Sequence, residues 1–152
     1  MRYLLAAALT FLTAAVPCRA DILLEHVYRS GYTLEEMSFS ITCSLSESGQ
    51  LGIERRAGAS LRSHSVLQLQ MSLPPLKASI AEAARGEISS VEPFPVDGPT
   101  RTYTAYRNLA DGRRVEVILS EESGDIGRKR VNASPAATRL MRFLDMHCGS
   151  GS

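Results

Sequence analysis

The three histidines of the chain, His26, His64 and His147, are the residues best suited to metal binding or acid–base chemistry. A zinc site takes three or four Cys, His or carboxylate ligands, and structural sites place them at short spacings. The one adjacent His–Cys pair, His147 and Cys148, would project about 100° apart around a helix, which makes a poor chelate. The spacing therefore predicts solvated or hydrogen-bonded histidines and no metal.

No local motif indicates a catalytic nucleophile or a cofactor-binding loop. The chain has no Gly-x-Ser-x-Gly elbow and neither of the common glycine-rich phosphate loops. Glu121, Glu122 and Asp125 crowd one predicted polar loop, whereas a glycosidase needs two carboxylates across a cleft. The sequence predicts no cofactor. An enzyme stays open only as a site whose members converge in the fold, built on His26 or His64.

Tyr103 and Tyr106 lie close in sequence to several arginines in the second half of the chain, and these two residue types are enriched at binding hot spots. The candidate partner-binding residues are Tyr103, Tyr106, Arg107, Arg113, Arg114, Arg128 and Arg130. Strand alternation would put Arg128 and Arg130 on one face and Lys129 on the other. Two alternatives stay open: Tyr103 in the core with Tyr106 alone exposed, and a charged strand edge protected from pairing. Aromatic residues do not interleave with the arginines, so nucleic-acid binding is not predicted.

The first twenty residues have the pattern of a secretory signal peptide. A positive start is followed by the uncharged run 4–16 and by small residues before a cleavage site between Ala20 and Asp21. The run is too short for a membrane anchor, which needs about 20 apolar residues, and no later segment is longer or more apolar. We therefore expect an exported protein of the periplasm or the extracellular medium; the many arginines favour a bacterium.

Removal of residues 1–20 leaves 132 residues with 15 basic and 16 acidic side chains, a formal charge of −1. Such a charge gives no strong field toward nucleic acid or an anionic membrane. The full chain is 44% hydrophobic and 22% charged, which is typical of a globular protein. We expect one domain over residues 21–152.

Cleavage also removes Cys18 and leaves two cysteines, Cys43 and Cys148, which an exported chain pairs as a disulfide. Cys43 lies on the apolar side of the alternating segment 37–45, and Cys148 lies on the apolar stripe of the helix expected at 135–148. Both faces point at one core. The bridge would close a loop of about 105 residues, for which chain entropy gives roughly 4–5 kcal/mol.

The remaining elements are read from periodicity and turn residues. Strands are expected at 37–45, 51–56 and 67–73, then a helix at 74–86 and a connection at 87–99. A second cycle has strands at 101–109, 115–119 and 127–132, with a hairpin turn at Asp111-Gly112 and a polar loop at 121–127. Segment 22–28 stays ambiguous between a strand and a helical turn.

The fold class is therefore α+β: an antiparallel sheet of about five to seven strands with two helices and one disulfide. The element order suggests two successive strand-strand-strand-helix units. Because no catalytic motif is present, we expect a small exported protein that binds another macromolecule, such as an inhibitor or immunity protein of a hydrolase. An accessory component of envelope or secretion machinery, and a small envelope hydrolase with a site assembled only in the fold, are the alternatives.

Overall fold

The computed structural model describes residues 21–31, 34–92, 96–124 and 126–149. The predicted signal peptide, residues 1–20, lies outside the described residues. Within the described part of the chain, no helix is both long and apolar enough to cross a membrane.

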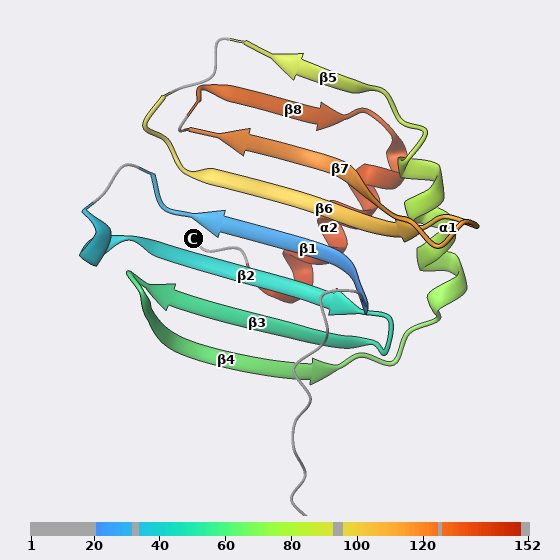
Figure 1. Cartoon of the computed structure of the whole chain (residues 1–152), viewed down its shortest axis with the longest axis horizontal. Helices are drawn as coiled ribbons and strands as arrows, with labels where there is room; N and C mark the ends of the chain where they lie inside the picture. The colour runs from blue at the N-terminus through green and yellow to red at the C-terminus, as the bar shows by residue number, and fades with distance from the viewer. Residues whose placement is uncertain (1–20, 32–33, 93–95, 125, 150–152) are drawn as a thin grey trace, which may run out of the picture.

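Eight antiparallel strands form one sheet in the order β4-β3-β2-β1-β6-β7-β8-β5 (Figure 1). The strands are β1 Ile22–Arg29, β2 Phe39–Ser46, β3 Gln50–Ala57, β4 Ser60–Gln68, β5 Ile88–Val91, β6 Thr100–Asn108, β7 Arg114–Ser123 and β8 Arg128–Asn132. A short 3-10 helix, η2, spans Glu35–Met37 between β1 and β2. β1, the ambiguous segment, is central and pairs with both β2 and β6.

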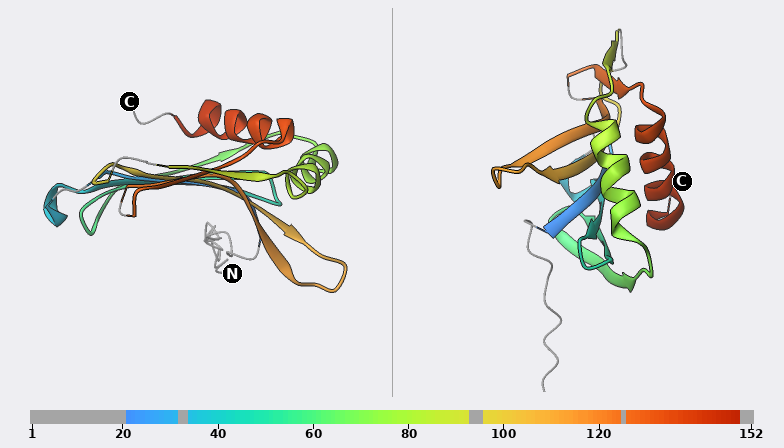
Figure 2. Two further views of the ribbon diagram at one scale, coloured as in Figure 1. Left: turned by 90° about the horizontal axis from the view of Figure 1, so that it is seen from above. Right: turned by 90° about the vertical axis from the view of Figure 1, so that its right-hand side faces the viewer.

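Two helices, α1 Leu73–Ala83 and α2 Pro135–Cys148, pack side by side on the same side of the sheet (Figure 2). α2 begins as its sequence predicts, because the Ser134 hydroxyl accepts a hydrogen bond from the Ala137 N–H at 3.1 Å and Pro135 follows at the first helical position. The tip of the β6–β7 hairpin leaves the sheet on the side away from α2 (Figure 2).

The hydrophobic core lies between this helical layer and the sheet. Its largest fully buried hydrophobic side chains are Leu24, Leu45, Leu51, Ile80, Leu119 and Leu144. The predicted disulfide Cys43–Cys148 is present in this core, with 5.8 Å between the two Cα atoms, and it ties the end of α2 to β2. The α+β class, the two helices and the bridge are thus confirmed.

The sheet has eight strands rather than the five to seven expected, because β5 was not expected, and β7 is longer than expected. β5 lies inside the segment expected to be a connection, and all four of its residues are exposed, so it carries no alternating pattern. β7 continues to Ser123 through the expected polar loop, because Glu121 and Glu122 face residues of β8 across the ladder. Each successive unit therefore has four strands before its helix rather than three.

The third strand was expected at 67–73, whereas β4 ends at Gln68. The alternation of Leu69, Met71 and Leu73 arises because these side chains pack against the core where the chain leads into α1. β4 itself is exposed along its whole length and shows no apolar face. The alternation therefore belongs mainly to a partly buried connection, and it missed most of the strand before it.

Candidate functional site

The sheet has one face under the helices and one face that no helix of the described chain covers. Tyr106 belongs to the uncovered face, since its neighbour Ala105 is fully buried in the core. Its hydroxyl donates a hydrogen bond to the Glu25 carboxylate at 2.9 Å. The Arg114 guanidinium lies 4.2 Å from the centroid of the Tyr106 ring and also donates to the Ile22 carbonyl at 2.7 Å. We call Glu25, Tyr106 and Arg114 the tyrosine cluster.

Arg128 and Arg130 form a second group on the same face, with Glu121 of β7. Each guanidinium donates to the Glu121 carboxylate at 2.8 Å. Burial opposes ionisation of this carboxyl, but the hydrogen bonds from the two arginines outweigh it, and the pKa of Glu121 is lowered. Lys129 takes the other face and pairs with Glu122 at 2.6 Å.

The other three candidate residues take different positions. Arg113 is exposed in the hairpin turn, where it pairs with Asp111 at 2.7 Å. Arg107 lines a cavity near the end of β6. Tyr103 lies in the core, which is the alternative position expected for it. The structure therefore brings Tyr106 together with Arg114 and Arg128 together with Arg130, and it places Arg107 in the lining of a cavity that Tyr106 also lines.

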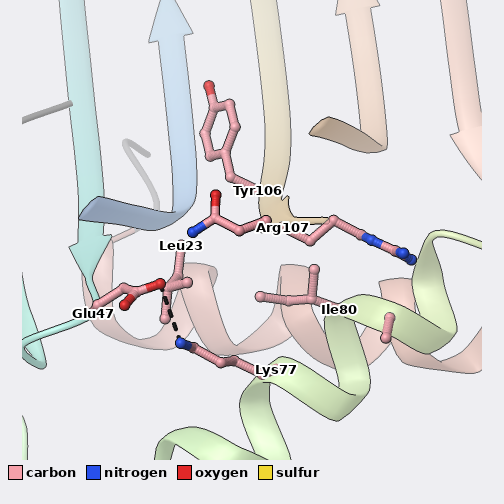
Figure 3. Close-up of a pocket in the computed structure, with 8 residues that line it drawn as sticks. Leu23, Glu47, Lys77, Ile80, Tyr106 and Arg107 are labelled. Atoms are coloured by element: carbon pink, nitrogen blue, oxygen red, sulfur yellow. Dashed lines mark ion pairs between the residues drawn. The ribbon is translucent and has the colours of Figure 1, made fainter. Parts of the chain in front are cut away.

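The cavity has a volume of about 220 Å³ and lies between α1 and the ends of β1, β2 and β6 (Figure 3). Leu23, Ile80 and Ala81 give it an apolar lining. Lys77 of α1 and Glu47 after β2 form an ion pair of 3.1 Å beside it. The other lining residues are Tyr106, Arg107 and Asn108. Because Tyr106 belongs to both, the cavity adjoins the tyrosine cluster.

The helix-covered face holds a polar group of Tyr103, His26 and Asp145, of which the sequence did not single out Asp145. Tyr103 donates from its hydroxyl to the Asp145 carboxylate of α2 at 2.6 Å. Burial, followed by this hydrogen bond, raises the pKa of Tyr103. His26 lies between Tyr103 and Cys43 in the strand register and is only 4% exposed. The alternation Leu24, His26, Tyr28 was the signal that could have placed His26 inside.

Two observations concern the metal-binding and histidine chemistry considered for the described residues. No group of three or more His, Cys, Asp or Glu side chains is placed there to hold a metal ion. The cavity lining includes neither His26 nor His64. His64 lies on the exposed strand β4, opposite Glu54 in the ladder with β3.

Compared with known proteins, the chain matches no family model and no curated protein.

Proposed function

We propose that this chain is an exported protein that acts by binding another macromolecule, and that the tyrosine cluster on the uncovered sheet face is the centre of its contact surface. The observation that supports this proposal is the ordered pair of Tyr106 and Arg114 on that face. A protein partner fits best, because Tyr and Arg anchor protein interfaces and no aromatic platform for nucleic acid accompanies them.

The cluster is suited to binding because its side chains are already fixed. The Tyr106 hydroxyl is held by Glu25, and the Arg114 guanidinium is held by the Tyr106 ring and a main-chain carbonyl. Side chains that are ordered before binding lose less conformational entropy when a partner docks. They lie on β1, β6 and β7, inside the sheet rather than on a loop, so their positions are set by the ladder.

Inhibition of a hydrolase is the form of binding that we favour. Such an inhibitor needs a rigid surface and no chemistry of its own. Here the sheet supplies the surface, and the disulfide fixes α2 behind it. Arg128 and Arg130, which both pair with Glu121 on the same face of the sheet, would extend the contact surface toward an acidic partner.

The test is an affinity capture with the chain from Asp21, its disulfide formed, as bait for envelope and secreted proteins. Tyr106→Ala and Arg114→Ala should each weaken capture of the specific partner at least about tenfold. Arg139→Ala is the matched control, because Arg139 is an exposed arginine in an ion pair with Glu82 on the helical side of the molecule. A stoichiometric hydrolase would support inhibition, whereas envelope or secretion components would support the accessory role. Capture unaffected by either cluster variant, or no capture by the folded bait, would overturn the proposal.

A further inference from the structure

The edge strand β4 is longer than the opposite edge strand, and its one ladder irregularity and its one formal charge, Arg62, both lie near its start. β4 has nine residues, all exposed, and nothing in the described chain pairs with its outer side (Figure 1). The other edge strand, β5, has only four residues. Natural sheets keep their edges short, bulged, charged or covered, because a long free edge is a template for another strand.

The backbone groups available on this edge follow from the ladder with β3. The Leu69 N–H donates to the Gly49 carbonyl at 2.9 Å, in the same register that places Gln68 opposite Gln50. In an antiparallel ladder alternate residues bond to the same neighbour, so the odd-numbered positions near Leu69 face β3. His64, Val66 and Gln68 therefore direct their N–H and C=O groups outward.

We propose that β4 pairs antiparallel with β4 of a second copy of this chain, about a two-fold axis at Ser65, so that one sheet continues through both copies. This register sets His64 opposite Val66 and Ser63 opposite Leu67. Each pair shares a face of the sheet, as antiparallel neighbours must. An axis at His64 would instead set Leu61 opposite Leu67, which lie on different faces because the ladder is irregular between Arg55 and Arg56.

The composition of β4 suits pairing with itself. Its only formally charged residue is Arg62 near one end, so antiparallel pairing sets each Arg62 opposite Gln68 and keeps the two arginines apart. Val66 and Leu67 are 48% and 50% exposed, and strand addition would shield both. A single added strand buries less than the roughly 800 Å² per partner of a standard interface, so we expect a Kd of micromolar order.

Disulfide trapping gives the sharpest test. Ser63 and Ser65 lie on the same face of β4, but only a cysteine at position 65 should cross-link the two copies. In the proposed pairing the two Ser65 Cα atoms stand about 4.5 Å apart, within reach of a disulfide. The two Ser63 residues are offset by four positions, about 14 Å along the strand. Under mild oxidation, Ser65→Cys should give a covalent dimer and Ser63→Cys should not.

Sedimentation analysis of the chain from Asp21 supplies the independent readout. Between about 1 and 100 µM the wild-type protein should shift from monomer to dimer. Val66→Pro should weaken this association at least about tenfold while retaining the fold, since the register directs the Val66 N–H outward, away from β3 and from every other strand of the described chain. A monomer throughout this range, or equal trapping of the two cysteine variants, would overturn the inference. Neither result bears on partner binding by Tyr106 and Arg114, which lie away from β4.

Discussion

The His26 imidazole stacks on the Tyr103 ring with 4.3 Å between ring centroids and 5° between ring planes. Neither ring nitrogen of His26 has a hydrogen-bond partner among the described residues. The ring is therefore held by stacking and packing alone, beneath α2 and beside Cys43. This environment suits a neutral imidazole and opposes a charged one.

Acid should destabilise the protein through His26. Burial lowers the pKa of His26 below its ordinary 6.5, although the charge of Asp145 opposes this shift and that of Arg101 adds to it. The unfolded chain thus takes up the proton at higher pH than the folded chain. The stabilisation is complete above about pH 6.5 and is lost as pH falls through the folded pKa, with a slope of at most about 1.4 kcal/mol per pH unit.

The measurement is urea unfolding of the chain from Asp21 at about pH 7.5 and about pH 5.5. His26→Phe keeps the ring stack and should lose less stability between these two pH values than the wild type does. His64→Phe, on the exposed strand β4, is the matched control and should behave as the wild type. An unchanged pH response in His26→Phe would contradict this explanation.

Reduction of the disulfide should cost about 2–5 kcal/mol of unfolding free energy, because the bridge closes a loop across most of the described chain. The measurement is guanidinium unfolding with and without a thiol reductant. The double variant Cys43→Ala/Cys148→Ala should match the reduced wild type and should not respond to the reductant. A reductant effect in the double variant would point to a different cause.

Sequence patterns predicted the elements that bury one face and missed those that do not. Cys43 and Cys148 were placed correctly because each lies in phase with an apolar repeat, of period two in β2 and of helical period in α2. β5 has no buried residue, so its sequence has no alternation of apolar and polar residues that would predict a strand. The acidic end of β7 resembled a loop because its charges pair with an arginine and a lysine of the neighbouring strand. A pattern read from consecutive residues does not reveal such cross-strand pairs.

The candidate site was only partly visible for a similar reason. Tyr106 and Arg114 belong to one hairpin, and their proximity follows from the turn at Asp111-Gly112. Glu25 reaches Tyr106 only because β1 pairs with β6 across 81 positions of sequence. No spacing rule connects residues so far apart, and the sequence of segment 22–28 leaves a strand and a helical turn equally open.

Asn132 should be a large single contributor to stability. It is buried, and its side-chain N–H groups donate to the Ala83 carbonyl at 2.9 Å and the Ile118 carbonyl at 3.2 Å, while its oxygen accepts from the Ser134 N–H at 3.0 Å. It thus joins α1, β7 and the start of α2. Asn132→Ala should lose about 2–4 kcal/mol in denaturant unfolding, because buried partners are left unpaired. Ser89→Ala, on the exposed β5, should lose less than about 1 kcal/mol; equal losses in the two variants would contradict the role given to Asn132.

Glu121 should stabilise the fold only where it is ionised. Its pKa is lowered in the folded state by Arg128 and Arg130 despite the opposing effect of burial, so its contribution is present above the ordinary value of 4.5 and is lost as pH falls through the folded pKa. Glu121→Gln should therefore cost about 1–2 kcal/mol near neutral pH and less near pH 3, which lies below the ordinary value of 4.5. Glu54→Gln is the matched control, since Glu54 pairs with Arg56 at the exposed surface and should change stability by less than about 1 kcal/mol. The measurement is chemical unfolding of the wild type, Glu121→Gln and Glu54→Gln near neutral pH and near pH 3. A Glu121→Gln cost that persists undiminished in acid would show that shape, rather than charge, is what the two arginines require.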